Sequence, residues 1–247
     1  MLLPDLGEIH DQYLALARLA REGGALGGER NEGLGGRLLL RVGFDAEGIS
    51  VLIAAGLAGA AALCVDPEPE LLREGLRHGL CDFLVADLSE ALRILKNETR
   101  RGRAVSVCVA EEPEALLAEM AERGVQPDLL SVESDGPPSA DVFRDRGAIA
   151  LPAAEADLET EQLVWSVEAD APRILPQLAQ MAAAALDERR KDTPARQRWL
   201  ADAPRRLGRS WAGRQCLRMT AGEAKAFAHR ARAEFSAVSI SLEGRQS

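Results

Sequence analysis

The sequence predicts an α/β protein built on a doubly wound, mostly parallel sheet with helices on both faces. Short apolar runs, typical of buried strands, alternate with helix-like stretches from residue 37 to residue 151. The run at 104–110, Ala-Val-Ser-Val-Cys-Val-Ala, is rich in β-branched residues, and the run at 37–42 is almost continuously apolar. Such an alternation favours parallel strands joined by right-handed crossover helices.

The elements can be placed in order along the first 151 residues. Apolar side chains recur at helical spacing over residues 5–22, and the glycine-rich residues 23–36 end that helix. Strands are predicted at 37–42, 60–66, 82–85, 104–110, 128–133 and 148–151. Helices are predicted at 49–59, 68–79, 87–101 and 111–123, the last with Pro113 in its first turn, where proline is tolerated.

The rest of the chain is predicted to be mainly helical. Helices are expected within 153–193, where Pro172 and Pro176 can kink them, and at 193–207 and 221–234. Strands are expected at 214–219 and 236–242, the second near a sheet edge. Because no repeat or low-complexity linker interrupts the sequence, we expect one domain over 1–247 with a helical insertion or appendage at about 153–210.

The turn after the first strand is the expected ligand position, because free N–H groups at a helix start bind anions. The turn Gly43-Phe44-Asp45-Ala46-Glu47-Gly48 has two glycines, but also two carboxylates where a dinucleotide site has none. Asp66 ends the second strand 23 residues after Gly43, which suits a ribose-binding acid. Because Pro67 follows, a turn or helix start is the alternative role for Asp66.

Charge and hydropathy exclude several classes of protein. The net charge of −9 argues against a nucleic-acid partner. Residues 189–232 nevertheless hold 13 Lys or Arg against 3 Asp or Glu, which indicates either solvated helices or a face that binds an anion or a partner. No stretch of eighteen apolar residues and no signal peptide is evident, so we expect no membrane span and a cytoplasmic location.

No catalytic residue and no metal site is predicted. The four cysteines, Cys64, Cys81, Cys108 and Cys216, are scattered, and buried reduced thiols are the simplest expectation. The histidines His10, His78 and His229 are far apart and share no metal-like spacing with other ligands. The tryptophans Trp165, Trp199 and Trp211 are expected in the core or at an interface.

Several motifs resemble those of the central NAD-binding domain of urocanase (urocanate hydratase). The clearest stretch begins at Asp87-Leu88-Ser89-Glu90 and ends at Arg123-Gly124-Val125-Gln126-Pro127-Asp128, similar to the family's "R-R-G-V-R-P-D" turn. Weaker likenesses occur at 36–40, 66–67, 76–79, 198–200, 214–217 and 234–237. The resemblance implies a Rossmann-like fold over most of this chain, which corresponds to the middle of a longer urocanase.

The resemblance also implies that an NAD site would include Gly43, Gly48 and Asp66. The family's loop "G-G-L-G-G-M-G-G-A-Q" falls on residues 42–51, where only those two glycines remain. The family's "G-N-A-A-E" becomes Glu111-Glu112-Pro113-Glu114 here, again anionic, and the segments that supply the family's active-site cysteine have no counterpart. We therefore expect no cofactor, or NAD if the ancestral site is retained; the acidic turns could also bind a cation or a basic ligand.

Three hypotheses about function follow. The first is a urocanase-like protein without hydratase activity that acts by binding or assembly, as a homo-oligomer or with a partner protein. In it, Trp165, Trp199 and Trp211 would contribute an exposed apolar interface. The second is an NAD- or nucleotide-binding enzyme, a lyase related to urocanate hydratase, that completes its site with another chain. The third is a regulatory or anion-binding module that uses the arginine-rich stretch 189–232.

Overall fold

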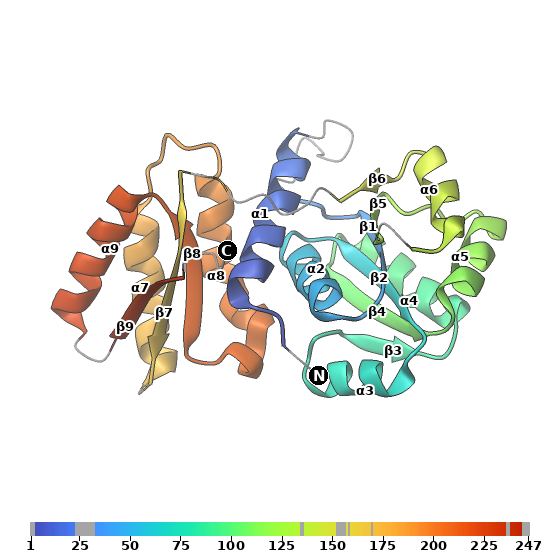
Figure 1. The fold of residues 1–247 in the computed structure, drawn as a ribbon, viewed down its shortest axis with the longest axis horizontal. Coiled ribbons are helices and arrows are strands. Elements are labelled where there is room, and N and C mark those ends of the chain that lie inside the picture. The colour runs from blue at the N-terminus through green and yellow to red at the C-terminus, as the bar shows by residue number, and fades with distance from the viewer. Residues whose placement is uncertain are drawn as a thin grey trace.

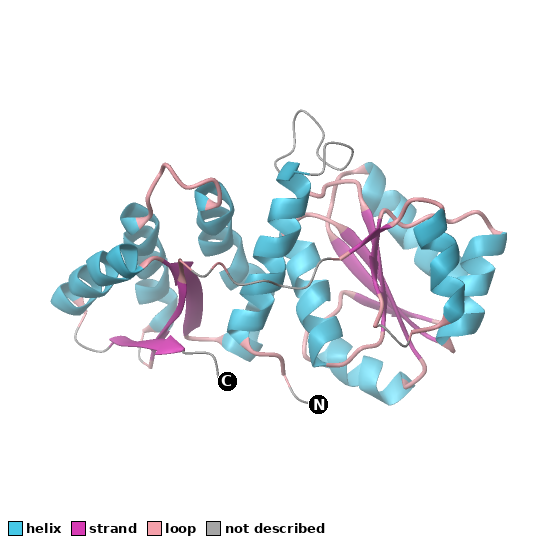
Figure 2. Ribbon diagram, turned by 45° about the horizontal axis from the view of Figure 1, so that its top comes forward, coloured by secondary structure: helices cyan, strands magenta, loops and turns pink. Residues whose placement is uncertain are grey.

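The computed structural model describes residues 3–22, 33–133, 136–151, 157, 159–168, 170–235 and 238–243. Most of the predicted glycine-rich stretch, at 23–32, lies outside these residues, as do the first two residues of the predicted strand 236–242. The described strands form two sheets, one of six strands and one of three, and helices cover both (Figures 1 and 2).

The larger sheet is parallel throughout. Its strands are β1 (Leu38–Val42), β2 (Ala61–Asp66), β3 (Phe83–Val85), β4 (Val105–Ala110), β5 (Leu129–Ser131) and β6 (Ile149–Ala150). They lie in the order β3-β4-β2-β1-β5-β6, and each neighbouring pair is parallel. The predicted doubly wound sheet is therefore confirmed, with the strand order reversing direction beside β1.

Helices pack on both faces of this sheet because its strands are apolar on both sides. They are α1 (Leu6–Glu22), α2 (Ala46–Leu57), α3 (Pro69–Arg77), α4 (Leu88–Arg100), α5 (Pro113–Glu122), η1 (Pro138–Ala140) and α6 (Asp141–Asp145). Leu39 and Cys64 belong to the buried cluster shared with α1 and α2, whereas their neighbours Leu40 and Leu63 belong to the cluster shared with α4 and α5. This alternation is what a strand covered on both sides produces.

The smaller sheet is antiparallel and corrects one expectation. Its strands are β7 (Glu161–Val167), β8 (Arg214–Met219) and β9 (Val238–Glu243), in the order β8-β7-β9. The prediction of a mainly helical segment at 153–193 was wrong at 161–167, where Leu163, Val164 and Trp165 are buried in the central strand. Strands β8 and β9 were predicted, β9 correctly at an edge.

Four further helical segments complete this part of the chain. They are α7 (Ala171–Ala185), α8 (Thr193–Leu207), η2 (Gly208–Trp211) and α9 (Ala221–Glu234). Thr220 caps α9 in a capping box with Glu223, which fixes the start of that helix. Pro172 lies in the first turn of α7, while Pro176 lies inside the helix without dividing it.

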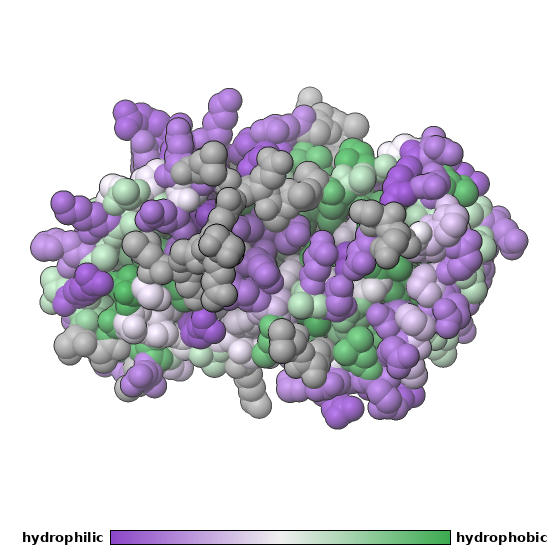
Figure 3. Space-filling model, viewed as in Figure 1, coloured by the Kyte–Doolittle hydropathy of each residue, from purple (hydrophilic) through white to green (hydrophobic). Residues whose placement is uncertain are grey.

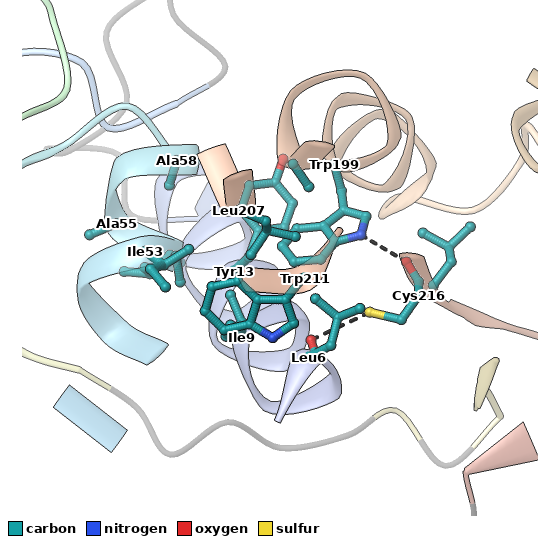
Figure 4. Packing of buried hydrophobic residues seen from close by; sticks show 14 of the residues in the cluster. Leu6, Ile9, Tyr13, Ile53, Ala55, Ala58, Trp199, Leu207, Trp211 and Cys216 are labelled. Atoms are coloured by element: carbon teal, nitrogen blue, oxygen red, sulfur yellow. Dashed lines mark hydrogen bonds between the residues drawn. The ribbon is translucent and has the colours of Figure 1, made fainter. Parts of the chain in front are cut away.

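Helix α1 lies between the two sheets and joins their cores (Figure 1). The indole N–H of Trp199 donates to the Cys216 carbonyl at 2.8 Å, and the Cys216 thiol donates to the Leu6 carbonyl at 3.4 Å (Figure 4). Trp165, Trp199 and Trp211 are all buried inside the chain. The expectation that they form an exposed interface is therefore wrong, since the second sheet and α1 bury them.

The described surface is largely polar. On the face in Figure 3, hydrophilic side chains predominate and hydrophobic ones lie in separate small groups. The large apolar side chains that remain exposed are far apart in the sequence: Leu3 precedes α1, Leu76 lies on α3 and Phe83 lies on β3. Among the described residues, no helix combines the length and the apolar character that crossing a bilayer requires.

Candidate functional site at the first strand-to-helix turn

The turn between β1 and α2 uses both of its glycines for its own geometry. Gly43 has a φ of +91°, which favours glycine over any residue with a side chain. A Cβ atom at Gly48 would lie 2.3 Å from the Gly43 carbonyl oxygen, so α2 can approach the turn only with glycine there. Asp45 caps α2 by accepting a hydrogen bond from the Gly48 N–H at 2.7 Å.

Asp66 lies at the end of β2, beside this turn, and both of its oxygens accept backbone hydrogen bonds. Oδ2 accepts from the Phe44 N–H at 2.8 Å, and Oδ1 accepts from the Glu68 N–H at 2.9 Å. The carboxylate is only 8% exposed. Asp66 therefore joins the turn after β1 to the turn after β2. This arrangement agrees with the alternative role for Asp66 before Pro67, that of a turn or helix start.

The ring of Phe44 fills the space between the turn and α3. It is completely buried, and a Cβ atom at Gly75 on α3 would lie 2.4 Å from the ring. The absence of a side chain at Gly75 therefore allows the phenyl ring to pack against the helix. An aromatic side chain thus occupies one side of the edge at which a nucleotide lies in proteins of this architecture.

Arg41 is the functional residue at this edge that the sequence analysis did not identify. Its guanidinium is buried; Nε donates to the Gly43 carbonyl at 3.1 Å, and the terminal nitrogens donate to the Ser131 hydroxyl at 3.2 Å and to Asp45 at 2.9 Å. Glu133 lies 3.6 Å away. The available signal was a charged residue inside the otherwise apolar run 37–42.

These residues do not fit a dinucleotide in the described conformation. The pyrophosphate of such a ligand needs unpaired N–H groups, but Phe44 and Gly48 already donate to Asp66 and Asp45. Asp45 and Glu47 are exposed at the turn, where their charges would repel a phosphate. The positive charge of Arg41 is already surrounded by Asp45 and Glu133.

Three of the four cysteines, which are far apart in the sequence, come together in the fold. Cys64 and Cys108 stand opposite each other on β2 and β4, and all four cysteines are buried and unpaired, as predicted. The neighbouring thiols of Cys64 and Cys81, together with burial, raise the pKa of Cys108 well above its usual range. The Cys108 thiol is therefore protonated near neutral pH.

The histidines do not form a site. His10 is completely buried on α1, while His78 and His229 are exposed on other elements. Burial, and next the positive charge of Arg218, lower the pKa of His10 to about 3. No group of His, Cys, Asp or Glu suited to a metal ion occurs within the described residues.

Residues of the arginine-rich stretch contribute to several different parts of the fold. Arg196 is buried against Glu223 at 2.8 Å, and Arg206 reaches from α8 to Asp82 beside the parallel sheet at 2.8 Å. Arg190 and Arg218 instead line a cavity beside α1. The structure thus distributes these charges among internal ion pairs, a contact between the two sheets, and a pocket.

One comparison identifies the relationship. A sequence model of the urocanase Rossmann-like domain matches residues 7–135, which is more than half of the chain. The matched range starts in α1 and includes β1 to β5, so it contains the β1–α2 turn and Asp66. The predicted resemblance is confirmed, and the chain belongs to the urocanase family.

Proposed function

We propose that this member of the urocanase family does not hydrate urocanate and acts by binding or assembly. The observation that carries the proposal is the closed β1–α2 turn, whose Phe44 and Gly48 N–H groups are satisfied by Asp66 and Asp45. The urocanase family is associated with NAD. The resemblance implies that hydration of urocanate would require NAD to be held firmly. Exact positioning of reactants supplies much of a catalysed barrier reduction, so a turn closed to the cofactor argues against that reaction.

Electrostatics support the same conclusion. At an effective dielectric constant of about 20, two like unit charges 4 Å apart repel by about 4 kcal/mol. Asp45 and Glu47 would place two such charges near a pyrophosphate, and Glu112 exposes another carboxylate after β4. A single charge-assisted hydrogen bond from a ribose hydroxyl to the Asp66 carboxylate would return only about 1.5–3 kcal/mol.

The first test is the reaction itself. We expect the purified protein, supplied with NAD, to leave the urocanate absorbance unchanged relative to a sample without protein. A clear enzyme-dependent loss of absorbance would contradict the proposal.

The second test measures the cofactor directly. We expect calorimetry to give an NAD dissociation constant weaker than about 1 mM, equivalent to less than about 4 kcal/mol of binding free energy. The variant Asp45→Asn with Glu47→Gln removes both charges while asparagine can still cap α2, and it should bind NAD more tightly. A matched control is Asp87→Asn with Glu90→Gln, because Asp87 caps α4 in the same way, accepting from the Glu90 N–H at 2.9 Å.

The control variant should bind NAD as the wild type does. Micromolar binding by the wild type, abolished in Asp66→Ala, would favour the alternative of an NAD-binding enzyme related to urocanate hydratase. In that case the turn must open to admit the cofactor, and mixing with candidate partner chains would be the way to look for a completed site.

A protein partner is favoured by an exposed sheet edge. Strand β3 ends the parallel sheet, and the side chain of Phe83 on it is 45% exposed. Edge strands with exposed apolar residues are suited to pairing with another chain. We expect light scattering to detect a homo-oligomer, or a complex with a partner, that Phe83→Lys weakens and Leu76→Lys on α3 leaves intact. A monomer at every concentration, with no partner, would contradict assembly.

Four unpaired buried cysteines suit a reducing compartment, in keeping with the cytoplasmic location we propose.

A further inference from the structure

A cavity of about 390 Å³ lies beside α1, away from the β1–α2 turn. Its walls are the C-terminal half of α1, the residues Asp157 and Thr160 before β7, and the segment that leads into α8. It shares no lining residue with the turn, and its volume falls within the range of about 300–1,000 Å³ typical of small-ligand pockets. Its lining residues come from α1, from the residues before β7, from the start of α8 and from β8, so segments distant in the sequence form one pocket.

The pocket has an excess of positive charge in a protein that is acidic overall. Its lining includes five cationic side chains and three aspartates, so five minus three leaves two positive charges. Glu159 and Glu22, which pair with two of the cations, are 78% and 61% exposed, so solvent screens their charges. The charge of the pocket is therefore opposite in sign to that of the β1–α2 turn, where carboxylates predominate.

Two of the cations have their positions fixed by aspartates. Arg218 forms a two-contact ion pair with Asp11 on α1, with one N–O distance of 2.6 Å. Arg190 pairs with Asp157 and, at 3.2 Å, with Asp192. These pairs connect α1 to β8 and the segment before β7 to the start of α8, so they hold the walls of the pocket in place.

Two of the other three cations, Arg18 and Lys191, are available to a ligand. Arg18 on α1 and Lys191 on the facing segment are exposed, and neither side chain forms a hydrogen bond or ion pair with the described residues. Arg21 donates to the Lys191 carbonyl at 2.8 Å, which ties the two walls together and keeps Arg18 and Lys191 on either side of the cavity. Leu14 and Ala195 add an apolar part to the lining.

We propose that this pocket binds a small organic anion whose phosphate or carboxylate group is held between Arg18 and Lys191. Both cations suit either oxyanion, and arginine can contact two oxygens at once. Leu14 and Ala195 would contact the apolar part of the ligand. This site goes beyond the proposed function, because it is separate from the turn and does not depend on whether NAD binds there.

Calorimetry at constant ionic strength tests the site, with inorganic phosphate and succinate as the two probes. We expect saturable binding of at least one probe; phosphate alone would assign a phosphate group, and succinate alone a carboxylate group. The variant Arg18→Glu with Lys191→Glu should weaken binding by at least about tenfold, because it replaces two attractive charges with two repulsive ones.

The matched control is Lys96→Glu with Arg100→Glu. These cations are also exposed, and they line a different hollow beside α4, so the control changes the net charge equally at another place. It should change binding by less than about twofold. The variant Arg18→Lys keeps the charge but not the two-oxygen contact, so it should retain more affinity than Arg18→Glu and less than the wild type.

The site is also mapped by amide NMR shifts during the phosphate titration. Shifts that cluster at Thr160 and Lys191 would support the pocket, whereas shifts elsewhere would overturn it. The proposal also fails if the wild type binds neither probe, or if the control variant loses as much affinity as Arg18→Glu with Lys191→Glu. NAD binding measured in the variant Arg18→Glu with Lys191→Glu reports on the turn without the pocket, so the two proposals can fail independently.

Discussion

Among the described residues, two arginines are almost completely buried, one beside each sheet, and they differ in the exposure of the carboxylates around them. Arg196 on α8 pairs with Glu223, whose side chain is only 4% exposed, and it also donates to the Thr193 hydroxyl at 3.0 Å. Arg41 on β1 pairs with Asp45 and Glu133, whose side chains are 52% and 53% exposed. Arg196 is enclosed together with its counter-ion, whereas Arg41 lies at the edge of the parallel sheet, where its counter-ions still face solvent.

This difference shows that burial of a cation does not by itself define its role. The Arg196–Glu223 pair joins α8 to the capping box of α9, so it belongs to the internal framework of the second sheet. Arg41 instead belongs to the turn that proteins of this architecture use for ligands, and its half-exposed partners could rearrange without exposing the core. Substitutions of the two arginines should therefore lower the free energy of unfolding by different amounts.

The largest effect is expected at Arg196. Burial would raise the pKa of Glu223, but hydrogen bonds from Arg196 and from the N–H groups of Asp187 and Thr220 outweigh it and lower that pKa. Arg196→Met removes the main charge partner of a buried carboxylate and should cost about 3–5 kcal/mol of unfolding free energy in urea. The double variant Arg196→Met with Glu223→Gln should recover part of that loss, because glutamine removes the charge but keeps an acceptor for the Asp187 and Thr220 N–H groups. A double variant less stable than the single one would contradict this explanation.

The second effect concerns His10, a buried ionisable group without any counter-ion. The Gln162 amide lies close to the imidazole, but no hydrogen bond joins them, and the pKa of His10 is lowered from 6.5 to about 3. The folded state therefore binds fewer protons than the unfolded state between these values, so stability falls as the pH falls below 6.5. The expected slope is about 1.4 kcal/mol per pH unit.

This slope is best measured between pH 6.5 and 5.5, above the range in which most carboxylates titrate. The variant His10→Gln should lose the slope, whereas His229→Gln, at an exposed histidine on α9, should retain it. Equal slopes in both variants would mean that another group is responsible.

The third effect is at Arg41. Arg41→Met leaves Asp45 and Glu133 in contact with solvent, so the expected cost is about 2 kcal/mol, smaller than that of Arg196→Met. The same urea measurement compares the two variants directly. A loss at Arg41 equal to or greater than that at Arg196 would remove the distinction between them.

The smallest effect is expected where the two parts of the molecule meet. Arg206 contacts both Asp82 oxygens, at 3.0 and 2.8 Å, and the side chains are 27% and 33% exposed. Partial exposure weakens such a pair, so Arg206→Gln should cost no more than about 1 kcal/mol. A cost above 3 kcal/mol would mean that this half-exposed pair behaves like a buried one.

The parallel sheet could be predicted because its signals are local. The β-branched run at 105–110 and the turn residues around Asp45 and Asp87 mark strands and helix starts within a few residues of themselves. The strand at 161–167 was missed because its alternation is short and it pairs only with segments at 214–219 and 238–243, which are distant in sequence. Strand pairing of this kind depends on tertiary context more than on local preference.

For the candidate site, the sequence located the turn and its acidic residues but not their contacts. The positions of Gly43, Gly48 and Asp66 could be inferred from order along the chain, whereas the burial of Phe44 against Gly75 could not. The same holds for Arg18 and Lys191, which are far apart in sequence and face one pocket only because α1 lies between the two sheets.

The sequence by itself determined the doubly wound sheet, most of its element boundaries and the membership of the urocanase family, because periodicity and short motifs are local properties of a chain. Only the tertiary structure decided which charges are enclosed, which close the turn and which remain free. The reason is physical: the behaviour of a charged group depends on its burial and on the distance to its partners, and both are set by segments far away in the sequence.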